Sequence, residues 1–400
     1  MNNILRLTTK YKKAILSISY ALKFNKIALL FANIFLLVIV IVMFYRVLVG
    51  LLFICVYSAH ANPPVEFYNA DWEIVCDNTL TCRVAGFGRE VDDDESPISI
   101  LLERKAGADQ PITGGYFKYE SYKYEDDDKK EKILKNQPIS LVINNKDLGT
   151  LTKKPNSIYQ LKPHQLSALL KVLKRTDNEI FFKQGDRYWE LFDKGYNAVM
   201  LKMDEVQGRI GTIGAIIKPG KKNENHVYKP IPAPVIKKGA VIKSDERQNL
   251  TLEEVVAIFP EFKIRYRDEK EADCFSYDLD EEEVNFKPHF YLYKLDKNND
   301  LLKASCLTGA YNFSDAFWVI PKKKTNNNKI NYVGTYVFPE YSNGVIKSNS
   351  KGRGLGDCWL YEELTWDGYK FVPSAENTTG SCNGFAGGTW RLPLIVTQVK

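Results

Sequence analysis

Short, mainly apolar segments typical of strands recur through the first half of the chain beyond residue 61, separated by polar turn-forming residues. Residues 72–76 and 82–85 are two such segments on either side of the turn-forming residues 77–79, which predicts a hairpin. Further strands are expected at 98–104, 116–124, 139–143, 180–182 and 188–191, the last two as a second hairpin.

In three segments the apolar residues are instead spaced as on one face of a helix. After Pro163 the apolar residues fall at positions i, i+3, i+4 and i+7 of one face, namely Leu166, Leu169, Leu170 and Leu173. Residues 196–206 predict a second short helix. A third is expected at 252–259, with Thr251 as its N-cap.

Strand patterns dominate again beyond residue 245, at 290–293, 317–320, 332–338, 359–366, 369–372 and 394–399. Asp367 and Gly368, between the aromatic ends of two of these strands, are a strong hairpin signal. Upstream, residues 218–239 hold four prolines among lysines and asparagines, which is typical of an extended, exposed linker.

Together these patterns predict an α+β, β-rich fold of mostly antiparallel sheet with a few short helices. A length of 400 residues favours two folding units rather than one. We expect a first module at 62–217, a linker at 218–244 and a second module at 245–400, after an N-terminal leader at 1–61.

The leader allows two interpretations. Residues 27–45 are apolar apart from Asn33 and follow five lysines, so they could span a bilayer as an uncleaved anchor. Residues 43–61 also form a complete signal peptide, with Arg46, an apolar stretch at 47–57 and a small-x-small cleavage site ending at Ala61. A start at Met43, or cleavage after Ala61, is the favoured interpretation. Both place the rest of the chain outside the cytoplasm.

The leader also carries the whole basic excess of the chain. The formal charge is +6, but residues 1–61 contain seven Lys and Arg and no acid, and beyond them 48 basic and 49 acidic residues remain. The folded part therefore gives no charge argument for binding nucleic acid or an anionic membrane.

Six cysteines follow the leader, an even number that favours disulfides in an exported chain. Nearest-neighbour pairing is one of 15 connectivities, and it joins Cys76 to Cys82, Cys274 to Cys306 and Cys358 to Cys382. The alternative interpretation is that the cysteines bind zinc. It is disfavoured because the chain has no CxxC spacing and its histidines lie far from the cysteines in sequence.

Catalytic signatures are missing from the sequence. There is no GxSxG, HExxH or SxxK motif, and three histidines remain beyond the leader. Paired carboxylates occur in acidic runs, where exposure keeps both groups ionised and unsuited to paired acid and base chemistry. We therefore expect no catalytic residues, no cofactor and no metal.

One polar cluster stands out at the end of the predicted helix 196–206. Gly208 falls where a left-handed cap would end the helix, so Asp204, Gln207 and Arg209 gather at that end. The cluster could hold the polar groups of a ligand. The alternative, which is the commoner case, is that it ties the helix end to the neighbouring strand.

Several of these pieces resemble, in order, a bacterial family described as domain of unknown function 1176. The resemblance rests on Trp72, Cys76, Asp77, Asn78 and Cys82, on 102–107, on Met203, Asp204, Gln207, Gly208 and Arg209, and on 356–358, 366–368 and Cys382. The first module is also similar, more loosely, to the invasion-associated locus B proteins. These resemblances imply export to the envelope of Gram-negative bacteria and bring no established activity.

Two further candidates come from the C-terminal half. Asp357 precedes Cys358, and Trp390 lies in the Gly-rich segment after Cys382. A cleft that brought Asp357 and Trp390 to the cluster of Asp204, Gln207 and Arg209 would be the candidate binding site.

The leading hypothesis is a non-catalytic periplasmic protein that binds an envelope component or a foreign protein. No nucleic acid is expected as a partner, and contact with the membrane is expected only through an uncleaved leader. The alternative is an envelope hydrolase acting on cell-wall or glycan material, with Asp204 or Asp357 as candidate groups. A purely structural role is the third possibility.

Overall fold

The structure is a computed structural model that describes residues 63–91, 96–120, 137–244, 246–260, 289–308, 310–323 and 330–400. The leader expected at 1–61 lies outside these residues. Contacts group the chain from Ala61 to Lys400 as one compact unit. No helix in the described part of the chain is long and apolar enough to cross a membrane.

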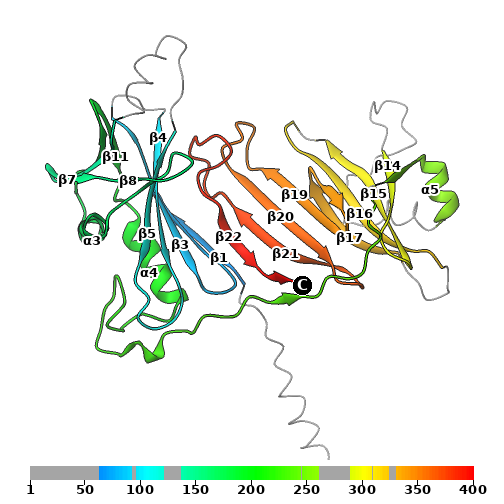
Figure 1. The fold of residues 1–400 in the computed structure, drawn as a ribbon, viewed down its shortest axis with the longest axis horizontal. Coiled ribbons are helices and arrows are strands. Elements are labelled where there is room, and N and C mark those ends of the chain that lie inside the picture. Colours follow the sequence, from blue (N-terminus) through cyan, green and yellow to red (C-terminus); the bar gives the residue numbers. More distant parts are fainter. Residues whose placement is uncertain are drawn as a thin grey trace, which may run out of the picture. The chain divides into compact units, whose positions relative to one another are not determined.

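An eleven-stranded antiparallel sheet fills the first half of this unit (Figure 1). The main path of the sheet runs β7-β6-β10-β11-β3-β4-β5-β9-β8, and β2 joins β3 from the side and carries β1. The strands are β1 (Val65–Asn69), β2 (Trp72–Cys76), β3 (Cys82–Glu90), β4 (Pro97–Arg104), β5 (Thr113–Tyr119), β6 (Ser140–Ile143), β7 (Lys146–Thr150), β8 (Thr152–Lys153), β9 (Tyr159–Gln160), β10 (Ile180–Gln184) and β11 (Arg187–Leu191).

The predicted hairpin at the start of the sheet is confirmed. Strands β2 and β3 pair with Cys76 opposite Cys82, and the two cysteines form a disulfide. Asp77 organises the turn: its Oδ1 accepts hydrogen bonds from the backbone N–H groups of Thr79 and Thr81, and its Oδ2 pairs with Arg83. The carboxylate thus satisfies the turn's backbone donors, which is why an aspartate suits this position.

Two helices cover the sheet, α3 (Pro163–Val172) and α4 (Tyr196–Val206). In α3, Leu169 is buried, and Leu173 is buried just past its end, whereas Leu166 and Leu170 stay half-buried. The apolar stripe predicted for this helix is therefore wider than the core it covers. In α4 the buried face holds Tyr196, Val199, Met200 and Met203, and the ring of Tyr196 packs edge-on against Trp72.

Two five-stranded antiparallel sheets form the second half, with one short helix, α5 (Leu252–Ile258), capped by the Thr251 side chain as predicted. The first has the order β13-β14-β15-β16-β17 and the second β18-β19-β20-β21-β22. Their strands are β13 (Arg247–Leu250), β14 (Phe290–Lys294), β15 (Asn299–Thr308), β16 (Phe313–Pro321), β17 (Asn331–Val337), β18 (Glu340–Ser342), β19 (Val345–Lys351), β20 (Trp359–Trp366), β21 (Phe371–Thr378) and β22 (Leu392–Val396).

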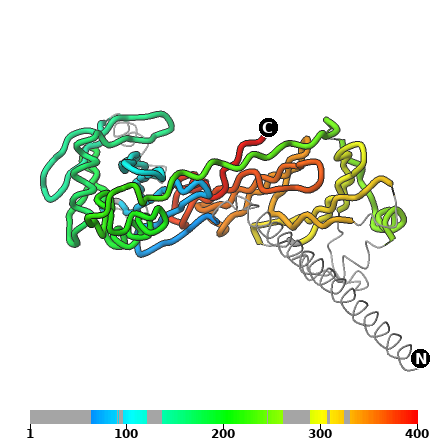
Figure 2. The backbone as a smooth tube through the Cα atoms, turned by 90° about the horizontal axis from the view of Figure 1, so that it is seen from below, coloured from blue at the N-terminus to red at the C-terminus, as the bar shows by residue number. Residues whose placement is uncertain are grey.

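The segment predicted as a linker is extended but attached. Strand β12 (Val235–Ile236) pairs in parallel with β23 (Gln398–Val399), and the Gly239 N–H bonds the carbonyl of Trp366. Figure 2 shows this green segment running beside the red C-terminal strand. Closer to the first sheet, Glu224 in the short 3-10 helix Glu224–His226 is buried, as is Val227 just after it, whereas the other residues of 218–228 are exposed.

The first half has one apolar core and the second half has two, and one further cluster joins the halves. Val75, Ala85 and Phe87 from the first sheet pack with Trp390, Leu392 and Leu394 from the last segment. Asn78 adds hydrogen bonds across the same boundary, because its side chain bonds the N–H and the C=O of Val396. The division into modules 62–217 and 245–400 stays a prediction.

The β-rich, mostly antiparallel fold is confirmed, with local corrections. The strand expected at 369–372 begins later, because Tyr369 lies in the turn, 88% exposed, and β21 starts at Phe371. The strand expected at 394–399 is split into β22 and β23, and the one expected at 116–124 ends at Tyr119 before residues that are not described. The pairs Cys76–Cys82 and Cys358–Cys382 are confirmed. Cys306 is disulfide-bonded, and Cys274 lies outside the described residues.

Candidate functional site

The end of α4 holds a buried polar network. Asp204 lies in the last turn of the helix and is fully buried, and its Oδ2 accepts hydrogen bonds from the N–H groups of Ile216 (2.7 Å) and Ile217 (3.0 Å). Burial raises the pKa of Asp204, and these two bonds and the charges of Arg104 and Arg209 oppose the rise. The carboxylate thereby fixes the loop that follows the helix.

Gln207 and Arg209 continue the network past the helix end. Gly208 between them has a φ of 68°, the left-handed conformation that the sequence predicts for a cap. The Gln207 side-chain amide donates to the carbonyls of Leu80 (2.9 Å) and Arg104 (3.0 Å), and its oxygen accepts from Nε of Arg209 (2.9 Å). The helix end is thus tied to the turn between β2 and β3 and to the end of β4.

Arg209 is the centre of this network. Its Nη1 forms an ion pair of 2.6 Å with Oε2 of Glu224, and its Nη2 donates to the carbonyl of Gly107 (2.6 Å). Oε1 of Glu224 accepts from the Thr212 hydroxyl (2.7 Å) and from the N–H of Gly214. Burial alone would raise the pKa of Glu224, but the Thr212 hydrogen bond and the Arg209 charge outweigh it, so the pKa is lowered.

The predicted cluster therefore exists, and it holds backbone in place. Asp204, Gln207 and Arg209 are each 0% exposed, so no ligand reaches them in this structure. Together with Glu224 they fix the loops 105–110 and 211–217. This is the structural alternative left open by the sequence, and it moves attention to the surface that the two loops shape.

A cavity of about 580 Å³ lies against these loops. One wall is α3, which contributes Leu166, Ser167 and Leu170; the other is formed by residues 213–216. Pro111 and Ile112 close it from the side, and Arg104 reaches it from the end of β4. The volume is in the range of small-molecule sites, and the half-buried leucines of α3 form its apolar surface.

Arg104 is 5% exposed and connects the cavity to the network. Its Nε donates to the carbonyl of Gln110 (2.8 Å) and its Nη2 to that of Gly214 (2.9 Å). Nη1 has no hydrogen-bond partner and lies 3.6 Å from Oδ1 of Asp204, which also lacks one. Burial, followed by the Arg209 charge, lowers the pKa of Arg104 to about 10, so the guanidinium remains charged at neutral pH.

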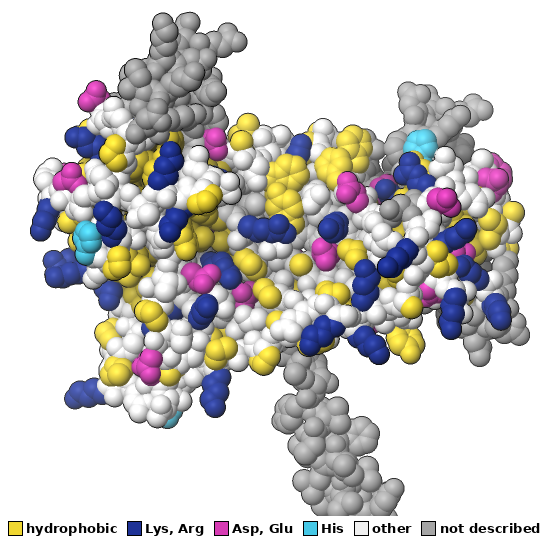
Figure 3. All heavy atoms as spheres, viewed as in Figure 1, with side chains coloured by type: hydrophobic (Ala, Val, Ile, Leu, Met, Phe, Trp, Pro, Cys, Tyr) yellow, Lys and Arg dark blue, Asp and Glu magenta, His cyan; other side chains and the backbone are white. Residues whose placement is uncertain are grey.

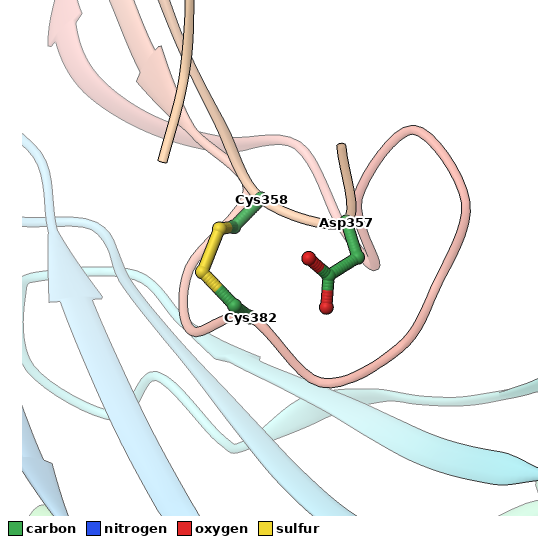
Figure 4. A group of neighbouring side chains, drawn as sticks. All are labelled: Asp357, Cys358 and Cys382. Atoms are coloured by element: carbon green, nitrogen blue, oxygen red, sulfur yellow. A yellow bond between two sulfur atoms is a disulfide. The ribbon is translucent and has the colours of Figure 1, made fainter. Parts of the chain in front are cut away.

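Asp357 occupies a different place, beside the Cys358–Cys382 disulfide (Figure 4). The ligand atoms of these three residues lie within 4.8 Å of one another, a spacing that could hold a metal ion. The sulfurs are bonded to each other, however, and the Asp357 carboxylate pairs with Arg353 and accepts from the N–H of Gly384 (2.7 Å). Donors to the carboxylate, first the Arg353 side chain, lower the pKa of Asp357. The group closes a loop and offers no thiolate.

Trp390 is 8% exposed and belongs to the core cluster shared by the two halves. Its indole N–H donates to the hydroxyl of Ser99 (2.8 Å), which in turn donates to the carbonyl of Gly86 (2.9 Å). In the described part of the chain, no hydrogen bond or ion pair joins Trp390 or Asp357 to Asp204, Gln207 or Arg209. The structure therefore does not assemble the single cleft that was expected from the sequence.

Glu362 and Glu376 face each other across β20 and β21. Burial is the main cause that raises both pKa values, and the Glu362 charge adds to the rise for Glu376. The pair has the like-charge arrangement from which acid and base roles are built. No other group in the described residues around it points to a ligand, so it carries no functional assignment here.

The pair does make a testable prediction about stability. Raised native pKa values favour the protonated acids, so their contribution is fully present below about pH 4 and is lost as the pH rises through the native values. Replacing Glu376 by Gln removes the repulsion across the strands and should raise the free energy of unfolding by about 0.5 kcal/mol at pH 8. Urea denaturation at both pH values measures this, and the exposed Glu246→Gln is the control. An equal gain at pH 4 would contradict it.

On the surface, Lys and Arg side chains are spread over the face drawn in Figure 3, with Asp and Glu among them. This agrees with the near balance of charge beyond residue 61. The cavity is therefore the better-defined candidate than any charged surface in the described residues.

The sequence reasoning missed Arg104 and Glu224. Arg104 lies in the segment 102–107, which was noted for its resemblance and given no role of its own. Glu224 is the only acid in the Lys- and Asn-rich segment 218–239, and a lone acid there was a usable signal. Two lysines line the cavity, Lys171 in α3 and Lys174 just past its end, and they carried no such signal because exposed lysines are common.

Three comparisons with known proteins complete the description. A family model described as "Protein of unknown function (DUF1176)" matches residues 66–397. The chain is similar to the uncharacterized protein YpfG of Escherichia coli (strain K12), with 26% identity over 329 residues that cover 77% of this chain and 86% of the relative. No solved structure matches the chain.

Proposed function

Because the chain belongs to the DUF1176 family of proteins of unknown function, no activity comes with its relatives, and we propose from its geometry that it is a non-catalytic ligand-binding protein of the cell envelope. The observation that carries this proposal is the cavity beside α3, whose 213–216 wall is held from behind by the buried network of Asp204, Arg209 and Glu224. A largely apolar cavity with a few placed polar groups is the usual form of a small-molecule site.

The location is part of the proposal. The disulfides Cys76–Cys82 and Cys358–Cys382 indicate an oxidising compartment outside the cytoplasm. The finer assignment, periplasmic export by a signal peptide at 43–61, rests on the leader sequence. Mass spectrometry finding Asn62 as the mature N-terminus would support it, and a retained leader would contradict it.

The alternative of an envelope hydrolase gains no support from the two acids considered for it. Asp204 is fully buried and accepts two backbone hydrogen bonds, and Asp357 is paired with Arg353. A general acid or base must be within hydrogen-bond reach of a substrate, and neither carboxylate meets that condition here. Binding without catalysis is therefore the function that the site supports best.

Filling the cavity tests the proposal. Ser167 is an exposed residue of α3 that lines the cavity, so Ser167→Trp should occupy it without disturbing the core. We expect the small-molecule fraction of a bacterial envelope extract to raise the melting temperature of the natural protein by about 2–4 °C, as for a ligand near ten times its Kd. The shift should be lost in Ser167→Trp.

Lys202→Trp, on α4 and away from the cavity lining, is the matched control and should keep the shift. A shift that survives in Ser167→Trp would place the ligand elsewhere. The absence of any shift in the natural protein would count against a binding function for this cavity.

A further inference from the structure

We infer that the cavity beside α3 binds an amphiphile with an anionic head group, a carboxylate or phosphate on an aliphatic chain. This deepens the proposed function and rests on it. The basis is the positive charge and the apolar surface of the lining, together with the buried charge of Arg104.

The charge of the lining has one sign. Arg104, Lys171 and Lys174 all line the cavity, and none of the described residues that line it is acidic. In the folded part as a whole the charges nearly balance, so three cations and no acid around one cavity is a local feature. An anionic group is the complement to such a lining.

Arg104 places a buried positive charge behind this lining. Two of its three nitrogens donate to backbone carbonyls, which fixes the plane of the guanidinium in a side chain that is 5% exposed. Nη1 is buried and faces Oδ1 of Asp204 at 3.6 Å, so it is not reached from the cavity. Arg104 therefore adds to the positive potential at the cavity, and the exposed Lys171 and Lys174 would contact the anionic group directly.

The rest of the lining selects an apolar chain. Leu166 and Leu170 on α3 pack against the core with one side and stay half-buried, and Ile213, which also lines the cavity, is 64% exposed. Removing this apolar surface from water would favour binding in proportion to the area covered. Lys171 in the helix and Lys174, two residues past its end, are both exposed, so a chain along the leucines would place its head group near these two cations.

The test uses defined probes on the natural protein. Titration calorimetry below the micellar concentration would compare dodecyl phosphate and laurate with dodecyltrimethylammonium, which has the same chain and the opposite charge, and with inorganic phosphate, which has no chain. We expect the two anionic amphiphiles to bind at least about tenfold more tightly than either of the others. The two anions also separate a phosphate from a carboxylate head group.

A second experiment reverses the charge of the two exposed lysines that line the cavity. The double variant Lys171→Glu/Lys174→Glu changes exposed residues and should fold, and we expect it to weaken dodecyl phosphate binding at least about tenfold. Lys153→Glu/Lys154→Glu alters the net charge equally, at exposed residues outside the lining, and should change the affinity less than about twofold.

The outcomes separate the two proposals. Equal affinity for the anionic and cationic amphiphiles, or no effect of the Lys171/Lys174 reversal, would overturn the anion inference while leaving a ligand cavity in place. If no probe binds and the envelope extract gives no cavity-dependent shift, the proposed function falls together with the inference.

Discussion

Replacing Arg209 by Met should lower the free energy of unfolding by about 3–5 kcal/mol, because it leaves the carboxylate of Glu224 buried without its counter-charge. The same change removes the donor to the Gly107 carbonyl and the partner of the Gln207 oxygen. Urea denaturation of the purified protein, followed by tryptophan fluorescence and by circular dichroism, measures the loss.

Two controls make this result specific. Lys202→Met breaks a surface ion pair with Glu205 within α4 and should cost less than about 0.5 kcal/mol. The double variant Arg209→Met/Glu224→Met removes both buried charges and should recover part of the loss. If Arg209→Met is no worse than Lys202→Met, the network does not hold the loops as described, and the cavity that they shape loses its support.

The second large effect is expected at the Cys358–Cys382 disulfide. Replacing both cysteines by Ser should cost about 3.5 kcal/mol on the chain-entropy model, because the bond joins residues 24 apart. The same replacement at Cys76 and Cys82, which are 6 residues apart, should cost about 2 kcal/mol. Unfolding in urea without a reductant measures both.

The test is which double variant loses more free energy of unfolding, because both variants lose one disulfide and gain two hydroxyls. An equal or reversed order would show that native packing around the hairpin, rather than loop length, sets the contribution. In neither variant should the anion affinity of the cavity change by more than about twofold, because none of the four cysteines lines it.

Local elements were predictable where the chemistry is local. The helix at 196–206 was predicted with the bounds that α4 has, because its apolar period and Gly208 mark both its face and its end. Strands β15 and β19 were missed. Their sequences are too polar to read as strands, and each is held by a neighbour on both sides, so pairing decides them.

The candidate site shows the same limit. Asp204, Gln207 and Arg209 were located correctly at a helix end, yet whether they face a ligand or the backbone depends on Arg104 and Glu224, which are distant in sequence. Asp357 and Trp390 were candidates for a cleft shared with this cluster. In the fold each serves its own contact, with Arg353 and with Ser99.

By itself the sequence determined a β-rich chain with two of its cysteine pairs and a basic excess confined to residues 1–61, because charge, cysteine spacing and periodicity are properties of short stretches. Only the tertiary structure decided which polar residues are buried and which cavity they support. That decision depends on contacts between segments as far apart as residues 104 and 204, where the cost of burying an unpaired charge selects the arrangement.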